Sequence, residues 1–328
     1  MSERGGAVIR RVLQGAARRA EPLLARQAVR LRREVNRLEP PPPAPPPVDL
    51  EPLFARLDAL EARLEQTREL QARTYEALFG WREQLARLRE QPGYDAAWED
   101  PEPLVSVRIA TYNNARLLCE RTLASLRRQS YERWEAIVVG DAVEDDTEDR
   151  IRALGDGRIR FVNLPVRGPY PDDELARKLV AGIPPMNRGL EESRGAWIAP
   201  LDHDDEFEDD HIEVLLDHAR ETRAELVYGK LRVREAGTGR IVPNVVGTWP
   251  PRHGHFGLQG ALYHGALRAF HLDLNARLID EPGDWNLTRR MWDAGVRFSF
   301  LDRIVTTYYW APVDEQGKAW LREVMGDS

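Results

Sequence analysis

Hydrophobic and polar positions follow two different rhythms along this chain. Up to residue 91, apolar residues recur at the three- and four-residue steps of helices. From residue 104 onward, short apolar runs that suit strands alternate with helical segments, in the order strand, helix, strand, helix, strand. This order is typical of an α/β fold built on a mostly parallel, doubly wound sheet. The pattern therefore predicts a helical extension followed by an α/β domain.

The first helical segment is basic and amphipathic. Apolar residues stand at helical spacing in residues 8–38, with a break near Pro22, and residues 1–39 hold ten Arg and four Glu, a balance of +6. Such a helix can lie on an anionic membrane surface or pair with another helix. A solvated helix with weak order is the alternative. Residues 40–49 are rich in proline, which predicts a stiff spacer and a domain boundary.

The second helix, in residues 50–91, carries a heptad seam. The middle of the seam is polar, which leaves two interpretations: a short coiled coil that makes homo-oligomers, which we favour, and a helical hairpin folded on the next domain. Gln91, Pro92 and Gly93 end the helix, and residues 92–103 are predicted to be a linker. The seam consists of Leu53, Leu57, Leu60, Leu64, Thr67, Gln71, Thr74, Leu78, Trp81, Leu85 and Leu88.

Polar residues follow three of the predicted strands of the α/β domain: residues 111–114 after the strand at 105–110, Asp141 after 135–139, and residues 202–205 after 196–201. Because the carboxyl ends of parallel strands meet at one edge of a sheet, these residues are expected to form a common site. Turn and helix-cap roles are the alternative for the first two groups. A further strand is predicted at 158–164, and helices at 115–129 and 147–154.

The acidic group is the strongest candidate for chemistry. Side chains alternate along a strand, so Asp202 and Asp204 share a face, and their charges raise each other's pKa unless a cation lies between them. Hard cations such as Mg²⁺ and Mn²⁺ bind carboxylate oxygens together with the phosphates of a substrate. The alternative is an acidic first turn of a helix, because Glu206, Asp209 and Asp210 follow.

Composition and charge narrow the function classes. The 328 residues are 42% hydrophobic and 31% charged, as in ordinary soluble proteins, and the length suits two domains. The net charge is −7, so the part after residue 39 carries −13, which argues against nucleic-acid binding by that part. A single cysteine, Cys119, fits a reducing compartment. No apolar stretch suits a membrane span or a signal peptide, so we expect a cytoplasmic protein, with peripheral contact at the inner face of the membrane through the basic helix.

The ordered set of motifs in the α/β domain resembles glycosyltransferase family 2, whose members have the GT-A fold. The resemblance spans roughly residues 104–310 and predicts a GT-A (Rossmann-like) domain over residues 104–312, followed by a helical tail at 313–328. The motifs that carry it are VSVRIATYN at 105–113, SLRRQSYERW at 125–134, VVGDAVEDDT at 138–147, NRGLEESRG at 187–195, LDHDD at 201–205 and GDWNLTRRMWDAG at 283–295.

The resemblance implies a nucleotide-sugar donor. Thr111, Tyr112 and Asp141 match positions that hold the base, typically uracil, with Asp141 accepting a hydrogen bond from the ring N–H. Asp202 and Asp204 match the Asp-x-Asp motif of the family, in which the first acid faces ribose or the donor sugar. The second acid is the main ligand of a divalent metal, Mn²⁺ or Mg²⁺, which Asp202 also contacts. The remaining donor-binding candidates are Asn113, Asn187 and Arg188, whose forked donors suit phosphate.

The same resemblance implies an acceptor side. Asp284 matches the position of the general base that removes the proton of the acceptor hydroxyl; its alternative role is a helix N-cap. Residues 249–260 are rich in aromatic residues, His and Gly and are expected to form an acceptor loop, with a plain connecting loop as the alternative. The acceptor-side candidates are Trp249, His255, Gln259 and Trp285.

The chain departs from the family pattern near the end of the domain. Many relatives place a His there as a further metal ligand, whereas this chain has no His after His271. Which group completes the metal site is therefore open. Residues 165–185 contain several Pro and Gly and are expected to form a long, mobile lid. The region of the missing His holds Thr307, Tyr308, Tyr309 and Trp310.

Together, the motifs predict an inverting, metal-assisted glycosyltransferase that moves a sugar from a nucleotide-diphosphate sugar, UDP-type favoured, to a glycan or lipid-linked acceptor. Homo-oligomers through the coiled coil are expected. The alternative is a catalytically silent scaffold that binds nucleotide sugars and acts through its coiled coil. A nucleotidyltransferase fits less well, because residues 111–114 are not the Gly-rich, basic phosphate loop that such an enzyme needs after its first strand.

Overall fold

The structure, a computed structural model, divides into two compact units that are described separately, Met1–Glu61 and Ala62–Ser328. In the first unit, residues 26–32 and 34 are helical and helix α2 (Glu51–Arg89) begins. The rest of the predicted basic helix, the proline-rich segment and the predicted tail at 313–328 lie outside the described residues. The described residues are 26–32, 34, 50–236 and 238–310.

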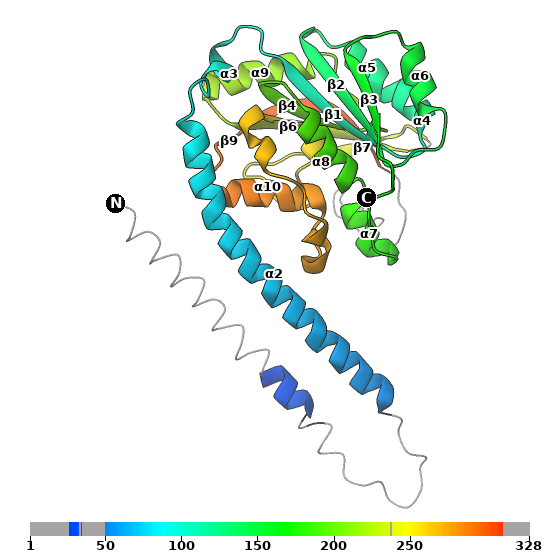
Figure 1. Ribbon diagram of the computed structural model, residues 1–328, viewed down its shortest axis with the longest axis vertical. Helices are drawn as coiled ribbons and strands as arrows, with labels where there is room; N and C mark the ends of the chain where they lie inside the picture. The colour runs from blue at the N-terminus through cyan, green and yellow to red at the C-terminus, as the bar shows by residue number, and fades with distance from the viewer. Residues whose placement is uncertain (1–25, 33, 35–49, 237, 311–328) are drawn as a thin grey trace, which may run out of the picture. The chain divides into compact units, whose positions relative to one another are not determined.

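The second unit is built on one mixed sheet (Figure 1). Within the described residues, nine strands lie in the order β3-β2-β1-β4-β8-β6-β9-β5, with β7 paired to β6. The first four strands are parallel, which confirms the predicted α/β sheet. They are β1 (Val105–Thr111), β2 (Trp134–Gly140), β3 (Ile159–Asn163) and β4 (Trp197–Asp202). The others are β5 (Glu206–Phe207), β6 (Leu226–Glu235), β7 (Ile241–Val246), β8 (Ala261–His264) and β9 (Phe298–Trp310).

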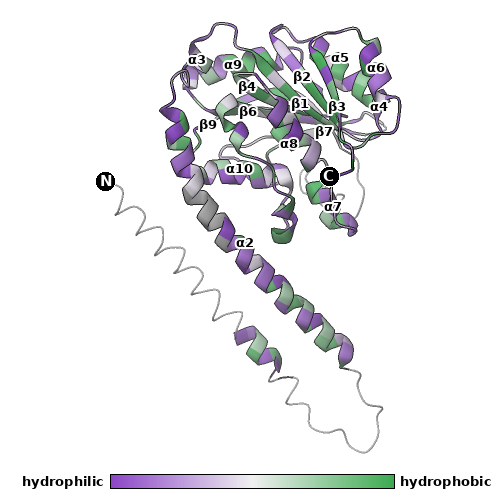
Figure 2. Cartoon of the chain, viewed as in Figure 1, coloured by the Kyte–Doolittle hydropathy of each residue, from purple (hydrophilic) through white to green (hydrophobic). Residues whose placement is uncertain are grey.

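Helices cover both faces of the sheet, and hydrophobic residues gather in its strands (Figure 2). All residues of β1 are buried, as expected for a strand covered on both sides. One face packs against α4 (Ala115–Leu117), a π-helical turn (Leu118–Thr122), α5 (Leu123–Arg127), α6 (Thr147–Ala153) and α9 (His211–Thr222). The other packs against α7 (Glu174–Val180), α8 (Ile183–Glu192) and α10 (Gly283–Ala294). Short 3-10 helices lie at Leu258–Gly260, Gly265–Ala269 and Leu274–Ile279.

Part of the predicted linker at residues 92–103 packs into the core. Its short helix α3 (Ala96–Glu99) carries Trp98, which is 5% exposed and donates its indole N–H to the carbonyl of Ala224 at 3.0 Å. The indole of Trp197, at the start of β4, donates to the carbonyl of Ala97 at 2.9 Å. Pro92 and Gly93 end helix α2 as predicted, but the aromatic residues after them bury too much apolar surface to remain a linker.

The end of helix α2 belongs to the second unit and packs within it. Trp81 stacks on Phe270 with 4.3 Å between ring centroids, and Leu85 is 1% exposed within the apolar layer that includes α8 and α10. Arg82 donates two hydrogen bonds to the carbonyl of Asp293. Trp81 and Leu85 are positions of the predicted seam, so here the seam contacts its own domain. Self-association through the earlier seam positions stays a prediction.

Residues 165–185, predicted as a long irregular lid, contain secondary structure. Helix α7 lies within them, and helix α8 begins at Ile183. Prolines stand in the first turn of α8, where the backbone N–H that proline lacks would have no acceptor within the helix. Gly182 precedes α8 with a φ of 80°, a conformation that favours glycine. The irregular part is therefore short and precedes α7, and its mobility stays a prediction.

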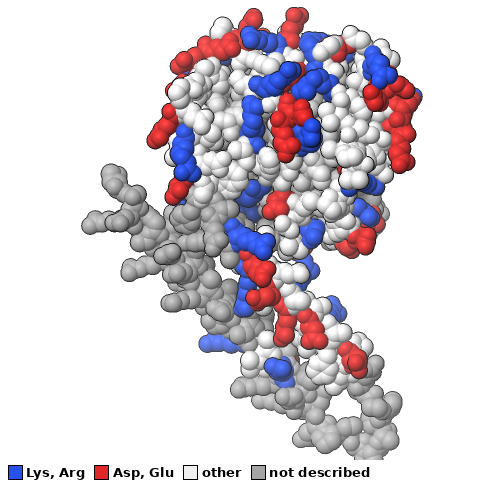
Figure 3. Space-filling view, in the orientation of Figure 1, with Lys and Arg blue, Asp and Glu red and all other residues white. Residues whose placement is uncertain are grey.

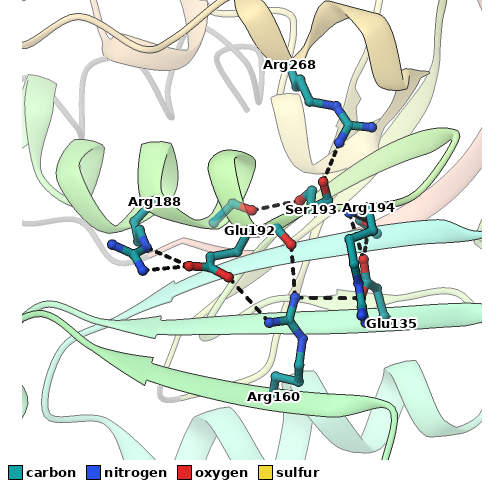
Figure 4. Close-up of polar contacts among 9 residues, drawn as sticks. Glu135, Arg160, Arg188, Glu192, Ser193, Arg194 and Arg268 are labelled. Atoms are coloured by element: carbon teal, nitrogen blue, oxygen red, sulfur yellow. Dashed lines mark hydrogen bonds and ion pairs between the residues drawn. The ribbon is translucent and has the colours of Figure 1, made fainter.

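At the amino ends of the parallel strands, two buried glutamates are held by arginines. Glu135 of β2 accepts hydrogen bonds from Ser106 at 2.7 Å and from the backbone and guanidinium of Arg194 at 2.5–3.0 Å (Figure 4). Glu225, directly before β6, accepts two bonds of 2.7 Å from Arg89 and one from the hydroxyl of Tyr94. We call this side of the sheet the amino edge.

The charged surface of the second unit is mixed. On the face shown in Figure 3, the described basic and acidic side chains are interspersed. Many of them pair one helical turn apart, such as Arg150 with Asp146 and Arg152 with Glu148. Among the described helices, none has an apolar stretch of the length that crossing a bilayer requires.

Candidate active site

Three strand ends that carry predicted site residues lie side by side in the sheet. Strands β2, β1 and β4 are parallel neighbours, and Thr111 at the end of β1 pairs with Gly140, directly before Asp141. On the other side, Ala110 of β1 pairs with Asp202 at the end of β4. The structure therefore brings the predicted base-binding residues and the predicted acids to one side of the sheet, which we call the carboxyl edge.

Asp141 lies at the end of this edge where the base is predicted to bind. It is 3% exposed; its Oδ1 accepts a hydrogen bond from the backbone N–H of Gly168 at 2.9 Å, and its Oδ2 accepts one from the hydroxyl of Tyr170 at 2.7 Å. The guanidinium of Arg167 lies 3.7 Å from the ring centroid of Tyr112. Residues 167–170 thus contact both side chains that are predicted to hold the base.

Sequence analysis did not assign Arg167 or Tyr170 to this site. Tyr170 lies 29 residues after Asp141, so no local pattern links them. The available signal was Gly168, because a Cβ atom there would lie 2.7 Å from side-chain atoms of Pro184 and Tyr170. A glycine that permits such a close approach fixes the path of the segment over the site.

The other two base-end candidates differ in their surroundings. Thr111 is 2% exposed, and its Oγ1 lacks a hydrogen-bond partner in the described part of the chain. A buried, unpaired hydroxyl is available to a ligand that reaches it. Asn113 has a φ of 44°, which Asn tolerates better than most residues, and its Oδ1 accepts the backbone N–H of Glu144 at 3.0 Å. Asn113 therefore joins two loops at the rim of the site.

The acids after β4 form an unneutralised group. Burial raises the pKa of Asp202 to about 6, and the neighbouring charge of Asp204 contributes in the same direction. Asp205 is fully buried, and burial together with the same neighbours raises its pKa well above the usual range. Among the described residues, no Lys, Arg or His lies within ion-pair distance of these three carboxylates. The group is therefore suited to bind a cation or to hold a proton.

The π-helical turn at Leu118–Thr122 fixes the loop that carries these acids. Arg121 donates from Nη1 to the carbonyl of Asp204 at 2.7 Å, and Thr122 donates from its hydroxyl to the carbonyl of Asp205 at 2.9 Å. Inserted π-turns of this kind are often found at functional sites. These contacts hold the backbone, and no donor in the described part of the chain bonds to the carboxylates of Asp202 and Asp204.

In contrast to the carboxylates of Asp202 and Asp204, the carboxylate of Asp205 accepts hydrogen bonds from the protein. Its Oδ1 accepts the backbone N–H of Tyr309 at 2.8 Å, and its Oδ2 accepts the amide N–H of Gln259 at 3.2 Å. Gln259 is 8% exposed. The expectation that Gln259 contacts an acceptor is therefore corrected: its side chain is buried behind the acids, and it supports Asp205.

Asp284 lies in the first turn of α10 but does not cap the helix. The N-cap position belongs to Pro282, so Asp284 is inside the helix, where its Oδ1 accepts the backbone N–H of Trp285 at 2.7 Å. Burial raises the pKa of Asp284, and its charge in turn raises the pKa of Asp202. Asp284 is thus close enough to the acid group to interact with it electrostatically.

Aromatic residues border Asp284. The ring of His253 stacks on Trp285 with 5.8 Å between centroids, and Trp249 contacts Trp292 edge-on at 5.7 Å. Trp249 is 53% exposed and Trp292, two turns after Asp284 on α10, is 40% exposed. His255 is exposed in the same loop. Apart from Gln259, the predicted acceptor-side residues thus lie at or near the surface in this region.

Two predicted donor-binding residues make other contacts. The amide of Asn187 donates to the carbonyl of Leu272 and accepts its N–H, both at 2.9 Å, which ties α8 to a distant loop. Arg188 donates to Glu192 one turn later at 2.6 and 3.0 Å, on the side of α8 that leads to the amino edge (Figure 4). The structure therefore does not bring Arg188 to the acids.

Comparison with known proteins identifies the domain. Residues 106–170 and 183–272 match the model of the family described as "Glycosyl transferase family 2", a range that contains both the base-binding end and the acid group. This chain belongs to glycosyl transferase family 2. The matched range ends before α10, so the family match does not itself cover Asp284.

The similarity between this family 2 chain and two of its relatives covers only part of each protein. It is 35% identical to the putative teichuronic acid biosynthesis glycosyltransferase TuaG of Bacillus subtilis over 37% of this chain and 43% of that protein. It is 27% identical to the UDP-Glc:alpha-D-GlcNAc-diphosphoundecaprenol beta-1,3-glucosyltransferase WfgD of Escherichia coli over 40% of this chain and 46% of that protein. The matched part thus spans less than half the length of either relative.

Solved structures confirm the fold of the family 2 domain. The crystal structure of residues 1–349 of TarS from S. aureus has a TM-score of 0.50 and 19% sequence identity, with 62% of this chain and 60% of that chain covered. At this identity, the similarity concerns the GT-A fold alone. The fold prediction made from the sequence motifs is confirmed.

The residues of this family 2 site fit a divalent metal only in part. No group of three or more His, Cys, Asp or Glu side chains in the described residues is arranged to hold a metal ion. The carboxylates of Asp202 and Asp204 supply two hard ligands, and Mg²⁺ or Mn²⁺ commonly completes such a pair with substrate phosphates and water. Tyr308 lies beside the acids, where burial, then the charge of Asp205, raises its pKa. A metal here would therefore need the donor as a ligand.

Proposed function

We propose that this chain is an inverting glycosyltransferase that transfers a sugar from a UDP-sugar to a hydroxyl of a glycan or lipid-linked acceptor. The observation that carries the proposal is the carboxyl edge, which brings together a proposed base-binding end at Asp141 and an unneutralised acid pair at Asp202 and Asp204, with the partly exposed carboxylate of Asp284 within electrostatic range. These are the groups needed to hold a nucleotide, to balance a diphosphate and to accept a proton.

The donor is supported from the base-binding end. Each oxygen of the Asp141 carboxylate accepts one hydrogen bond from the protein and retains capacity to accept another, for example from a ring N–H of uracil. Tyr112 offers a ring face on which a base stacks once Arg167 moves aside. The relative WfgD is named for its use of UDP-Glc, which favours a uridine nucleotide here as well.

The acid pair is the proposed metal site. Asp204, assisted by Asp202, would hold Mn²⁺ or Mg²⁺, and a bound ion would neutralise the negative charge that develops on the departing diphosphate. Without a cation, the two charges oppose each other, as the raised pKa of Asp202 reflects. The donor therefore completes the site, because its phosphates add the ligands that the described residues do not supply.

Asp284 is the proposed general base. Its raised pKa makes the carboxylate a better proton acceptor than an exposed aspartate, and it lies beside the aromatic residues that border the acceptor region. Asp205 is unsuited to act as a nucleophile, because Tyr309 and Gln259 occupy both of its oxygens in the interior. With Asp284 as the base and Asp202 and Asp204 assigned to the metal, the proposed step is a single displacement, which inverts the anomeric carbon, as the family resemblance implies.

The acceptor class is proposed from the relatives and the extension. WfgD acts on a diphosphoundecaprenol-linked sugar according to its name, which favours a lipid-linked acceptor. The basic residues 1–39 would hold the enzyme near anionic lipid, where such acceptors lie. Salt-sensitive binding of the full chain to anionic vesicles is expected in a co-sedimentation assay, and its absence at low salt would leave only helix pairing for this segment.

The test of the proposed function is nucleotide release. The full chain is incubated with UDP-glucose, UDP-N-acetylglucosamine, UDP-glucuronate and GDP-mannose, with Mn²⁺ or with EDTA, and free nucleotide is measured by chromatography. We expect slow, Mn²⁺-dependent release of UDP from one of the UDP-sugars by hydrolysis, because water can replace the acceptor. Failure to bind or cleave any of the four donors would contradict the proposal and favour the scaffold alternative.

A further inference from the structure

Arg108 is a buried cation that no described residue pairs. It lies in the middle of β1 and is 2% exposed. Its Nε has no hydrogen-bond partner, and no carboxylate of the described residues lies within 4.0 Å of its guanidinium. Its neighbours on β1 are Val107 and Ile109, so an apolar residue would suit the strand. Burying an unpaired charge in this way lowers stability.

The position of Arg108 is close to the acid group. It pairs with Pro200 of β4, two residues before the pair of Ala110 with Asp202, so it lies on the same face of the sheet, one pleat before the carboxyl edge. That face is covered by α8, where a Cβ atom on Gly189 would lie 3.2 Å from the Cβ of Arg108. Burial raises the pKa of Asp202 and Asp284, and the charge of Arg108 acts in the opposite direction, which places Arg108 within electrostatic range of both.

A second unpaired group accompanies Arg108. The hydroxyl of Tyr263 on β8 is fully buried and lacks a hydrogen-bond partner within the described residues. Burial raises the pKa of Tyr263, whereas the charge of Arg108 and a long side-chain contact from its guanidinium act in the opposite direction, so the two side chains are near one another. Apart from this approach to each other, the guanidinium and the hydroxyl have no acceptor among the described residues, so they form a local excess of hydrogen-bond donors, which an anion can satisfy.

An internal structural role explains Arg108 less well. Where this chain uses buried ion pairs for structure, it builds direct contacts, such as the two 2.7 Å hydrogen bonds from Arg89 to Glu225. Arg108 makes no such contact with Asp202 or Asp284, although both interact with its charge. A long-range counter-charge alone does not use the forked donors of arginine, which match phosphate and carboxylate geometry.

We propose that Arg108 is a donor-binding residue whose guanidinium binds an anionic group of the nucleotide sugar, either the diphosphate or the carboxylate of an acidic sugar. The inference rests on the proposed function, because it assigns a further residue to the same donor site. The partly exposed Asp202 marks where the donor approaches, and Arg108 supplies a fixed positive charge beneath it. The metal and Arg108 would thus balance the anion from two sides.

The test compares nucleoside with nucleotide affinity in Arg108→Met and Arg108→Lys. Titration calorimetry in Mn²⁺ is performed with uridine, UDP, UDP-glucose and UDP-glucuronate, and with guanosine and GDP in case the base is guanine. If Arg108 contacts the diphosphate, Arg108→Met should lower the affinity for the nucleoside diphosphate and for both UDP-sugars by about 10- to 100-fold, while the affinity for the nucleoside stays unchanged. If Arg108 contacts a sugar carboxylate, only the affinity for UDP-glucuronate should fall. Arg108→Lys should recover part of the loss in either case.

Arg194→Met is the matched control, since it removes an arginine that binds Glu135 at the opposite edge. It should leave all nucleotide affinities unchanged, and a thermal melt of each variant verifies folding. The proposal is overturned if Arg108→Met binds every ligand as the wild type does, or if it loses nucleoside and nucleotide affinity in equal proportion, which a structural role predicts. A wild-type chain that binds none of the ligands would contradict the proposed function itself, and this proposal with it.

Discussion

The two edges of the sheet hold their acids in opposite electrostatic states. At the amino edge, burial raises the pKa of Glu135 and Glu225, but hydrogen bonds from Arg194 and Arg89 outweigh it and leave both pKa values below the usual range. At the carboxyl edge, burial raises the pKa of Asp202 and Asp284, and no described arginine forms an ion pair with either. The same sheet thus neutralises its acids at one end and leaves them unneutralised at the other.

This difference separates structural acids from functional ones. An acid whose charge is paired with an arginine that donates hydrogen bonds to it stabilises the fold and has little need of a cationic ligand. An acid that is buried beside other acids destabilises the fold until a cation or a proton arrives. We therefore infer that the acids of the amino edge stabilise the fold, and that the unneutralised acids of the carboxyl edge bind the substrate with its cation.

Asp284→Asn tests the carboxyl edge and has the largest expected effect. Asparagine keeps the size of the side chain but cannot accept a proton, so sugar transfer should fall by about 10²- to 10⁴-fold, roughly 3–5 kcal/mol of barrier. Donor affinity and melting temperature should change little, because Pro282 holds the N-cap position. Initial rates and calorimetry with the donor found by nucleotide release provide the measurement.

Glu281→Gln is the matched control for that experiment. Glu281 is the neighbouring carboxylate, but Arg289 and Asn286 already donate to it at 2.7–2.8 Å, as at the amino edge. This variant should lose stability and retain most of its transfer rate. Normal turnover in Asp284→Asn together with a large loss in Glu281→Gln would reverse the assignment of the base.

Glu225→Gln tests the amino edge and should lower the free energy of unfolding by about 3 kcal/mol at pH 7. Glutamine removes the charge that Arg89 and Arg297 face, and its amide N–H groups oppose their donors. Urea unfolding gives the value. Asp95→Asn, which removes an exposed partner of Arg223, should change the free energy of unfolding little. Equal free energies of unfolding for the two variants would mean that the buried ion pairs of Glu225 stabilise the fold no more than an exposed ion pair does.

Asp202→Asn should raise the free energy of unfolding, whereas Glu225→Gln lowers it. In the wild type without metal, the unfolded chain ionises this aspartate near pH 4 and the folded chain near pH 6, so its contribution to stability falls as pH rises through that window. The variant should therefore gain up to about 3 kcal/mol over the wild type at pH 7.5 and almost nothing at pH 4.

The Asp202→Asn measurement is urea unfolding in EDTA at the two pH values, with donor affinity measured in parallel. The variant should lose Mn²⁺-dependent donor binding while it gains stability. For Glu225, the lowered pKa gives a contribution that is present above about pH 4.5 and is lost as pH falls further. A destabilised Asp202→Asn at pH 7.5 would show that the two edges do not differ in the way described.

Sequence patterns predicted the elements that are local in the chain. The strands β1 to β4 follow from short apolar runs, and the acids after β4 follow from their position at a strand end. Their convergence at one edge also follows, because parallel strands place their carboxyl ends together. The base-binding end and the acid group were therefore predictable before the structure.

Contacts between residues distant in the chain were not predictable. Trp98 was assigned to a linker because Pro92 and Gly93 precede it, whereas its indole bonds to Ala224, 126 residues away. Arg188 was placed with the donor by its motif, but a local partner, Glu192, holds it. Arg108 was passed over because it stands inside an apolar run, where only the structure shows that its charge is unpaired.

The most direct measurement of the central claim is the thermal shift produced by UDP and Mn²⁺ in three proteins: the wild type, Asp204→Asn and Glu135→Gln. A ligand that binds only the folded chain raises Tm, by about 5 °C at 100 times its Kd. Glu135→Gln should melt lower than the wild type but keep the full Mn²⁺-dependent shift. Asp204→Asn should melt at or above the wild type and lose that shift. A Mn²⁺-dependent shift that survives in Asp204→Asn, or that disappears in Glu135→Gln, would contradict the division of the sheet into a structural and a functional edge.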